Sequence, residues 1–409
     1  MSESRADCVI VGGGIGGAVL ALLLGRKGKH VVILEKETQP LPAARPEILA
    51  RSTLEIFRQI DLSERIQKEA ALELKGLELY RSREKLLLSF SAADFAANQT
   101  QPYSTDPALT RQILLEAAQA TQAVEVKRGV EVKELLEEEQ KVAGVRAVSG
   151  GESLIWRSPL VVGDDGSHSR VRQALGIRLK LREFPLEFLG AEGPELPGGK
   201  PDVGQAWLEP SGIRKNIFGG IFMPQPGNRT AFVFLLSPES RRHFETEPAK
   251  FYEALHSFSP RCLEIEKNYS FPKNFTVFHR PFGHAPRYVA DGAALIGDAA
   301  HPLTPAGGQG ANASVADAAA LARVALQAFE KNNFSMKQLF SYEMERRPAN
   351  ERSLQFSVWA NRVFQSLRIL PGLGALLFPF LESVNRNPQA KNRFLQNITR
   401  AFQSTPRSA

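Results

Sequence analysis

The N-terminal part of the chain alternates between short apolar runs and a helical stretch. Residues 8–11 are apolar and lead into a glycine-rich turn, residues 18–28 follow with helical character, and the next apolar run ends at Glu35. Short apolar runs bounded by turn residues are typical of strands buried on both faces of a parallel sheet. The pattern therefore predicts a β-α-β unit.

Further along, helix-like and strand-like patterns succeed one another. Residues 48–71 have mixed helical spacing, and residues 77–90 have the pattern of a pair of strands. Two more buried strands, at 160–163 and 293–296, each lead into a turn. Between them, residues 181–279 are rich in aromatic strand segments separated by Pro-Gly turns, which indicates a β-rich region.

These patterns predict an α/β fold in which the pieces of two lobes interleave along the chain. With 409 residues, the chain exceeds the roughly 250 to 300 residues at which one hydrophobic core stops growing. We expect a Rossmann-like nucleotide-binding domain, a β-rich substrate domain inserted into it, and C-terminal helices. The expected nucleotide-binding parts are residues 1–75, 104–180 and 280–330, the substrate-domain parts are residues 76–103 and 181–279, and the C-terminal helical, basic region is residues 331–409.

The turn after the first strand has the spacing of a dinucleotide-binding loop. Gly12 permits the tight turn, Gly14 lets the backbone approach a pyrophosphate, and Gly17 lets the helix pack closely on the strand. The phosphates would bind at the helix N-terminus, where N–H groups and the helix dipole favour negative charge. A loop that merely turned the chain would leave Glu35, 18 residues past Gly17, unexplained. Its carboxylate is placed to accept hydrogen bonds from a ribose diol and argues against a 2′-phosphate. The candidate residues here are Gly12, Gly14, Ile15, Gly16, Gly17, Glu35 and Lys36.

Charge and cysteine content narrow the class of protein. The formal net charge is +7, but residues 346–409 hold ten Lys and Arg against two Glu, and the rest is near neutral. No nucleic-acid-binding motif accompanies this basic end, so no nucleic-acid partner is expected. Cys8 and Cys262 form neither a disulfide framework nor a metal-ligand spacing, which indicates a reducing compartment and no metal site. The first apolar run follows Glu3 and Asp7 and continues into the fold, unlike a signal peptide, so a cytoplasmic location is expected.

The basic C-terminal region leaves two interpretations open. Residues 367–381 are apolar but contain two prolines and one arginine, so they are too short and broken for the roughly 20 residues of a spanning helix. A later helical face combines apolar and basic residues, which is typical of a helix that binds at the inner face of a membrane. The alternative is a terminal helix packed on the body of the protein with a solvated basic face. The apolar residues of that face are Phe394, Leu395, Ile398 and Phe402.

Two further motifs make the nucleotide site specific. The first is Gly-Asp-Asp-Gly-Ser-His-Ser-Arg-Val-Arg at 163–172, and the second is Gly-Asp-Ala-Ala-His-Pro at 297–302, followed by Pro-Ala-Gly-Gly-Gln-Gly-Ala-Asn at 305–312. Together with the glycine turn, in this order and at these distances, they resemble the single-component FAD-dependent aromatic hydroxylases. The resemblance is to the p-hydroxybenzoate hydroxylase type, including the ubiquinone-biosynthesis hydroxylases, and covers roughly residues 5–350.

This resemblance implies FAD as the cofactor. Asp298 would accept a hydrogen bond from a ribityl hydroxyl, although an aspartate there could also be a helix N-cap. The helix that opens at 307–312 would direct its N–H groups at the pyrimidine edge of the flavin and stabilise negative charge on the reduced ring. Pro305 would lie beside the isoalloxazine and is a candidate catalytic residue. The candidate contacts of this segment are Gly308, Gly310, Ala311 and Asn312.

The resemblance also implies roles for residues outside these segments. Arg45 and Arg111 resemble the family's two flavin-facing arginines, and Arg45 is a second, weaker catalytic candidate. Val132 is a candidate for a backbone contact to the adenine. Asp165 would link the cofactor to pyridine-nucleotide binding, unless it belongs to a plain strand-to-helix turn. His301 is expected to cap or pack its turn rather than transfer a proton, and Arg172 is expected to be structural.

The implied reaction is a hydroxylation. By resemblance, NADH or NADPH reduces FAD, O2 adds at the flavin C4a, and the resulting hydroperoxide passes one oxygen to an aromatic, lipophilic ring. The protein then has to supply a dry pocket more than acids or bases. Four aromatic residues of the β-rich region are candidate pocket walls or core residues, namely Trp207, Phe218, Phe222 and Phe234.

Two other functions remain open from the sequence. One is a related flavoprotein that reduces or halogenates a lipid-like substrate, although the halogenase signature Trp-x-Trp-x-Ile-Pro is absent. The other is a non-enzymatic prenyl-binding protein on the same fold. Asp298 and residues 307–312 disfavour it, because such a protein has no need of a flavin site.

Overall fold

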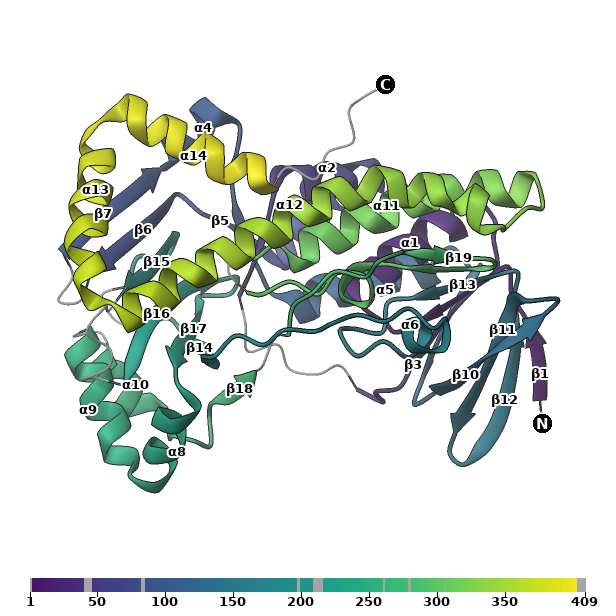
Figure 1. Ribbon diagram of the computed structural model, residues 1–409, viewed down its shortest axis with the longest axis horizontal. Helices are drawn as coiled ribbons and strands as arrows, with labels where there is room; N and C mark the ends of the chain where they lie inside the picture. Colours follow the sequence, from purple (N-terminus) through teal and green to yellow (C-terminus); the bar gives the residue numbers. More distant parts are fainter. Residues whose placement is uncertain are drawn as a thin grey trace.

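The computed structural model describes residues 2–39, 46–81, 85–196, 199–208, 216–259, 262–278, 281–305 and 307–402. It forms an elongated molecule in which one lobe contains a parallel sheet and the other an antiparallel sheet, and a long helix runs along both (Figure 1). The α/β fold class expected from the sequence is confirmed.

A six-stranded sheet forms the centre of the first lobe. Its order is β19-β20-β13-β2-β3-β9, and all neighbours are parallel except β19 and β20. Strands β2, β13 and β20 are fully buried apolar runs, as is typical of parallel sheets, whereas the edge strand β9 carries exposed charged residues. The bounds are β2 (Cys8–Val11), β3 (Val31–Glu35), β9 (Val124–Arg128), β13 (Leu160–Gly163), β19 (Val289–Ala290) and β20 (Ala293–Leu295).

Helices from distant parts of the chain cover this sheet. The helix α1 (Ile15–Gly25) packs against both α5 (Pro107–Gln119) and α11 (Gly310–Glu330). A second sheet, of order β1-β12-β11-β10, flanks the lobe. Its strands are β1 (Ser2–Arg5), β10 (Glu131–Glu138), β11 (Lys141–Ser149) and β12 (Glu152–Arg157), and the short helix α6 (Arg170–Ala174) contacts β10.

A seven-stranded sheet, of order β18-β14-β17-β16-β15-β6-β7, forms the second lobe. Parallel pairing of β6 with β15 inserts an early segment of the chain into a sheet made mostly of later ones. This pairing confirms that the pieces of the two lobes interleave. The bounds are β6 (Gly76–Arg81), β7 (Lys85–Ser91), β14 (Glu187–Pro194), β15 (Val203–Leu208), β16 (Ile217–Gln225), β17 (Arg229–Leu236) and β18 (Thr276–Phe278).

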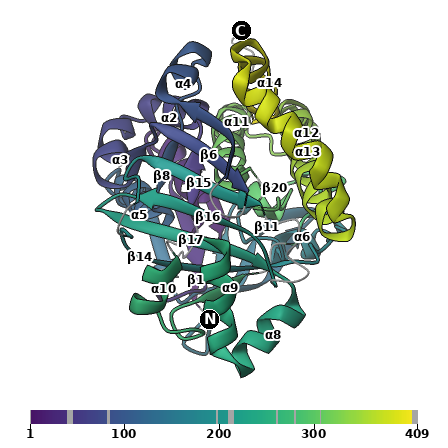
Figure 2. The same cartoon turned by 90° about the vertical axis from the view of Figure 1, so that its left-hand side faces the viewer.

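One face of the seven-stranded sheet carries three helices, α8 (Pro238–Thr246), α9 (Pro248–Phe258) and α10 (Cys262–Asn268), which lie beneath it in Figure 2. Phe222, Phe232 and Phe234 pack with Phe244 and Phe251 in the core between them. Apolar side chains at alternate strand positions thus bury much of one face.

The predicted helical stretch 48–71 is wrong in part, because it divides into four elements. These are β4 (Glu47–Leu49), α2 (Arg51–Gln59), α3 (Ser63–Glu69) and β5 (Ala71–Glu73). Asp61 adopts a left-handed backbone with φ of 56° between the two helices. The two strands pair with β8 (Tyr103–Thr105), where Ser104 lies opposite Ile48, 56 positions away, and opposite Leu72, 32 positions away. A distant partner thus replaces helical hydrogen bonds at both ends.

The C-terminal helices connect the two lobes. The helix α12 (Met336–Ile369) is followed by η3 (Pro371–Leu373), α13 (Gly374–Arg386) and α14 (Pro388–Phe402), and the last two pack on β7 and α4 (Ala92–Asn98) (Figures 1 and 2). Leu395 of α14 is only 5% exposed, in a cluster with Phe95 and Phe378. Of the two interpretations of this helix, the structure therefore shows packing on the body. No helix of the described residues is long and apolar enough to cross a membrane.

Candidate functional site

Four parallel strands end at one edge of the six-stranded sheet, which we call the cofactor edge. It comprises the segments that follow β2, β3, β13 and β20. From β2 the chain continues to β3, its neighbour on one side in the sheet, whereas the neighbour of β2 on the other side is the later strand β13. In open α/β sheets, ligands bind at such a reversal, outside the carboxyl ends of the strands. All three sequence motifs begin at this edge.

The glycine turn fits the backbone of the neighbouring segment closely. Gly12 has a φ of +100°, and a Cβ at this position would lie 2.3 Å from the carbonyl oxygen of Asp164. A Cβ at Gly14 would lie 2.3 Å from Oδ2 of the same aspartate. The helix α1 begins directly afterwards, at Ile15, so its first N–H groups face the cofactor edge. An added Cβ would therefore clash at both positions, with a backbone carbonyl at Gly12 and with a carboxylate side chain at Gly14.

Glu35 closes the far side of the turn. Its Oε2 accepts a hydrogen bond from the Gly13 N–H at 2.8 Å, and its Oε1 accepts one from the Glu37 N–H at 2.9 Å. A carboxylate has about four acceptor sites, so it can also accept from ribose hydroxyls. The neighbouring Lys36 instead extends into solvent and lies 3.6 Å from Glu37. Val132 is buried on β10, two residues past the Val130 N–H that donates to the Glu35 carbonyl.

The turn after β20 is hydrogen-bonded to a buried cluster of charged residues, Asp317, His301 and Arg346. Asp298 lies in a single 3-10 turn, η2 (Gly297–Ala299). The Gly297 N–H donates to Oδ2 of Asp317 at 3.1 Å, and the same oxygen lies 2.5 Å from Nε2 of His301. Nε of Arg346 donates to the other oxygen at 2.8 Å. His301 therefore packs its turn, as expected.

Opposing effects set the charge of Asp317. Burial acts to raise the pKa of this carboxyl, but the charges and hydrogen bonds of His301 and Arg346 outweigh burial and hold the pKa below its ordinary value. The carboxylate is thus ionised and fixed, and it anchors the turn that carries Asp298.

Asn312 connects α11 to the segment around β4. Its Oδ1 accepts from the Ala50 N–H at 2.9 Å and from the Thr53 hydroxyl at 2.6 Å, while its Nδ2 donates to the carbonyl of Ile48 at 2.8 Å. Its side chain is therefore used within the protein. The N–H groups of the first turn of α11, from Gly310 to Asn312, are the groups left to meet a ligand. A Cβ at Gly310 would meet no protein atom within 4 Å, so this helix end is open.

The remaining candidates have different surroundings. Pro305 is half-buried, and its carbonyl accepts from the N–H of Gly308, which has a φ of +62°. Arg111 is half-buried on α5. Arg45 lies outside the described residues.

Two residues of the second motif have structural contacts. Oδ2 of Asp165 accepts from the N–H groups of Arg170 and Val171, at 2.7 and 3.1 Å, and so caps α6 as in a strand-to-helix turn. Arg172 donates to the carbonyls of Ala299 and Ser167, at 2.8 and 2.7 Å, and joins the second motif to the third. Its structural role agrees with the expectation.

Sequence reasoning missed Asp164. Its carboxyl Oδ2 accepts from the Gly17 N–H at 2.7 Å and lies within the glycine turn. The available signal was its place directly after β13, because the carboxyl ends of neighbouring parallel strands share one edge.

Of the four candidate pocket walls, three belong to the core instead. Trp207, Phe222 and Phe234 lie on the face covered by α8 to α10. Phe218 packs against a separate cluster on the opposite face. That cluster consists of Phe184, Leu186, Phe188, Val233 and Leu235.

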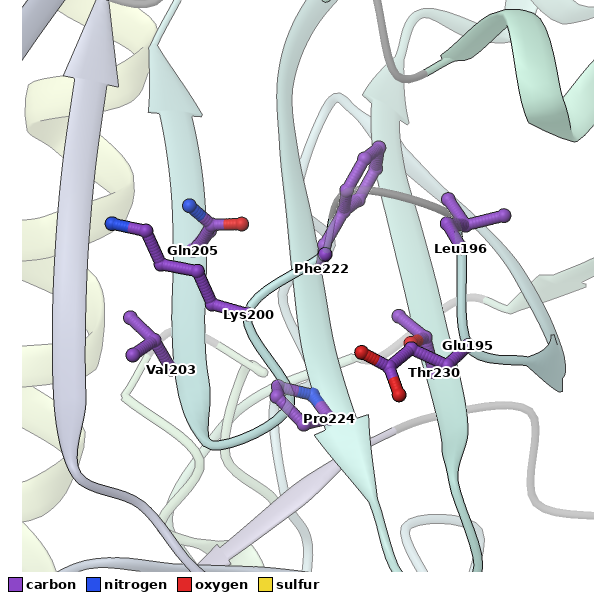
Figure 3. A pocket seen from close by; sticks show the side chains of 9 residues that line it. Glu195, Leu196, Lys200, Val203, Gln205, Phe222, Pro224 and Thr230 are labelled. Atoms are coloured by element: carbon purple, nitrogen blue, oxygen red, sulfur yellow. The ribbon is translucent and has the colours of Figure 1, made fainter.

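A shallow pocket opens on the same sheet face as Trp207, near the ends of β15 and β16 (Figure 3). Lys200 at its rim pairs with Glu78 at 2.6 Å, and Gln205 donates to the same carboxylate at 2.9 Å. These polar groups satisfy one another, and the pocket lies on the other side of the sheet from the Phe218 cluster.

The cofactor edge and the two-lobe fold define a dinucleotide-binding flavoprotein architecture. The chain belongs to the family described as FAD binding domain, which matches residues 5–357. The residues present fit this cofactor, because the glycine turn leaves no room for side chains, Glu35 offers acceptors, and two helix N-termini face the edge.

Named relatives indicate the class of enzyme. The chain is 26% identical to 6-methylpretetramide 4-monooxygenase of Streptomyces rimosus, over 89% of this chain and 85% of the relative. It is 27% identical to ubiquinone hydroxylase UbiL of Rhodospirillum rubrum, over 89% and 83%. The crystal structure of Pseudomonas aeruginosa PqsL in complex with 2-aminobenzoylacetate superposes with a TM-score of 0.77 at 24% identity, over 89% and 97%, and so shares the fold. The expectations of FAD and of an FAD-dependent aromatic monooxygenase are confirmed, and a reductase, halogenase or prenyl-binding protein is not favoured.

Proposed function

We propose that this monooxygenase uses NADH or NADPH, together with O2, to hydroxylate an aromatic ring of a lipophilic substrate. One observation carries the proposal: three motifs far apart in sequence converge on the cofactor edge, with the open end of α11 beside them. Relatives named for 6-methylpretetramide and ubiquinone support a substrate larger and more apolar than a simple phenol.

The residues of the cofactor edge have distinct proposed roles. FAD, when bound, supplies the activation of oxygen. The backbone of the glycine turn, from Gly12 through Ile15 and Gly16 to Gly17, holds the pyrophosphate, and Glu35 and Lys36 lie at the ribose end. Asp298 accepts from the ribityl chain. The proposed flavin-side contacts are Arg45, Arg111, Pro305, Gly308, Gly310, Ala311 and Asn312, with Asp165 towards the pyridine nucleotide and Val132 towards the adenine.

We assign the substrate wall to the sheet face that carries the Phe218 cluster. Much of the opposite face is covered by α8 to α10. The wall face is instead tied to the first lobe, because Gln225 at the end of β16 donates to the Ser104 hydroxyl of β8 at 2.6 Å. Apolar side chains here would keep water from the reacting atoms.

The first test is the visible spectrum of the purified protein, followed by NADH and NADPH oxidation with phenols, quinolones and polyprenyl phenols. We expect flavin bands and an oxidation rate that a ring substrate stimulates. Incorporation of one ¹⁸O atom from ¹⁸O2 into the product would establish hydroxylation. If ring compounds stimulate NADH or NADPH oxidation but none of them yields an ¹⁸O-labelled product, the proposed hydroxylation is contradicted.

The surface supports a second, independent proposal, which is peripheral contact with an anionic membrane. It would use the corner where α12 meets α13 rather than the packed face of α14. Ile369, Leu370, Leu376 and Phe380 are each more than half exposed there, and Arg386 lies exposed at the opposite end of α13. Exposed apolar side chains on an element that also carries basic ones are typical of surfaces that bind anionic lipid.

A further inference from the structure

The side chain of Asp164 lies where the glycine turn prepares a place for phosphate. Its Oδ2 accepts the Gly17 N–H at 2.7 Å, one of the N–H groups in the first turn of α1. A Cβ at Gly14 or Gly17 would come within 2.3 or 2.8 Å of the same oxygen. The other oxygen, Oδ1, faces the turn after β20, where a Cβ at Gly297 would lie 3.4 Å away.

Within the part of the chain that the structure describes, three carboxylates act on the charge of Asp164. Glu35 faces it from the end of β3, Asp298 from η2, and Asp165 from the next position of its own loop. Burial raises the pKa of the Asp164 carboxyl well above its ordinary value, and these three carboxylates raise it further, whereas the Gly17 N–H acts in the opposite direction. FAD would add the two negative charges of its pyrophosphate to this group. Neighbouring groups of like charge disfavour ionisation.

We propose that Asp164 is a neutral carboxylic acid in the FAD complex, with its proton on Oδ1, and that it helps to hold the pyrophosphate as a hydrogen-bond donor. The proton comes from solvent and remains on Asp164. Oδ2 is the acceptor of the Gly17 N–H, which leaves Oδ1 as the atom that carries the proton. The inference rests on FAD binding alone and not on the substrate of the proposed hydroxylation.

The alternative is that Asp164 remains ionised and simply caps α1. A carboxylate at a helix N-terminus gains from the dipole and from the N–H groups. That gain is available in the absence of cofactor, but an ionised Asp164 would repel the phosphates that this helix end is built to bind. Neutral Asp164 keeps the hydrogen bond from Gly17 and removes the repulsion.

The decisive measurement is the infrared difference spectrum between FAD-bound wild type and FAD-bound Asp164→Asn at neutral pH. We expect a carbonyl band of a protonated carboxylic acid in the wild type that the variant lacks. Asparagine has a similar shape, keeps the acceptor for Gly17 and offers a donor, so the variant should bind FAD within about threefold of wild type. Absence of the band would overturn the proposal.

The pH dependence of FAD affinity gives a second readout. Above the pKa of Asp164, wild-type affinity should fall by up to about tenfold per pH unit, because binding then takes up one proton. Asp164→Asn should lose this slope, and Asp61→Asn should keep it. Asp61 is an exposed partner of Arg26 with a left-handed backbone that asparagine tolerates. An unchanged slope in Asp164→Asn would overturn the proposal.

The experiments also separate a folding defect of the variant, and a failure of the proposed function, from a failure of this proposal. If Asp164→Asn does not fold, Asp164→Ser replaces it as the neutral variant, and ¹³C-labelled aspartate assigns the band in wild type. Neither readout involves substrate or NAD(P)H, so failure here would leave the proposed hydroxylation unaffected. A protein that binds no FAD would instead contradict the proposed function.

Discussion

At the scale of residues, the buried charges behind the cofactor edge are stabilised by their hydrogen-bonded and oppositely charged partners. Asp317 contacts His301, Arg346 and Asn350, all of them buried. A second group lies beside it, where Nε2 of His284 is 2.6 Å from the Tyr288 hydroxyl and Nδ1 is 3.1 Å from the Arg347 guanidinium. Since arginine only donates, Nδ1 of His284 is the acceptor and the imidazole is neutral.

His284 should make the protein sensitive to mild acid. Burial, together with the charges of His301 and Arg347, lowers the pKa of His284 from 6.5 to about 3. The unfolded chain therefore binds more protons than the folded one between these values, and stability falls as pH drops below 6.5. We expect a loss of about 2 kcal/mol between about pH 7.5 and about pH 5.

Urea denaturation across this pH range measures the effect. His284→Asn should flatten the dependence, because no imidazole remains to be protonated. The exposed His243 on α8 serves as a control, and His243→Asn should keep the wild-type slope. Equal slopes in wild type and His284→Asn would contradict the assignment.

Residue roles could be predicted where they depend on local spacing. The glycines of the turn and Glu35 follow from the geometry of one β-α-β unit. Asp164 could not be predicted in the same way, because its contact with Gly17 spans 147 positions of sequence. The hydrogen bond from the Ala50 N–H to Asn312 spans 262 positions of sequence and was likewise missed.

At the scale of elements, the turn between β2 and α1 can be tested by a pair of glycines. Gly12→Ala places a methyl group 2.3 Å from a backbone oxygen at a φ of +100°, whereas Gly28 has a φ of +71° with no atom within 4 Å of an added Cβ. Both changes carry backbone strain of roughly 1–3 kcal/mol. Only Gly12→Ala also has to displace the Asp164 backbone, so it should weaken FAD binding by at least ~10-fold. Fluorescence titration with FAD measures this, and equal affinities would contradict the fitted turn.

At the open end of α11, we expect the substitution Gly310→Ala to preserve or raise the stability of the apoprotein but to lower its affinity for FAD. Gly310→Ala adds a good helix former where no protein atom interferes, so the apoprotein should be unchanged or up to ~1 kcal/mol more stable. If the cofactor approaches this helix end, the methyl group should weaken FAD binding by about tenfold. Gly372→Ala, also without a neighbour within 4 Å, should change neither. An undiminished FAD affinity in Gly310→Ala would place the cofactor elsewhere.

The sequence predicted most elements but not those defined by distant partners. Strands β2, β13 and β20 of the parallel sheet are continuous apolar runs and were predicted. The stretch 48–71 was not, because its end strands exist only through pairing with β8. The apolar face of α14 could be predicted, but what covers it depends on Phe95 and Phe378.

At the scale of the whole molecule, α12 links the two lobes. Arg346 near its start reaches the charge cluster behind the cofactor edge, and its end joins the exposed corner next to α13 (Figure 1). Across the lobes, Arg229 of β17 pairs with Asp106 at the start of α5, at 3.2 Å. The domain limits given above from the sequence stay a prediction.

The membrane proposal is tested on this corner. Vesicles of phosphatidylglycerol should bind the protein more strongly than phosphatidylcholine, and added salt should weaken binding. Leu376→Glu combined with Phe380→Glu should abolish it. Met336→Glu with Met344→Glu, which changes exposed apolar residues elsewhere on α12, should leave it intact. Sedimentation of the wild type and both double variants with vesicles measures the difference. Equal binding by all three proteins would exclude the corner between α12 and α13 as the membrane-binding surface.

The strand order also determines when the chain can fold during its synthesis. One edge of β13 pairs with β2, but the other waits for β20, whose residues 293–295 emerge 130 positions later. At 5 to 20 residues per second, a ribosome takes roughly 7 to 26 s to supply that partner. During this interval a fully apolar edge stays unpaired, which is the condition under which nascent chains associate with one another. Slower initiation at lower temperature, which spaces neighbouring nascent chains along the message, should therefore raise the yield of folded protein.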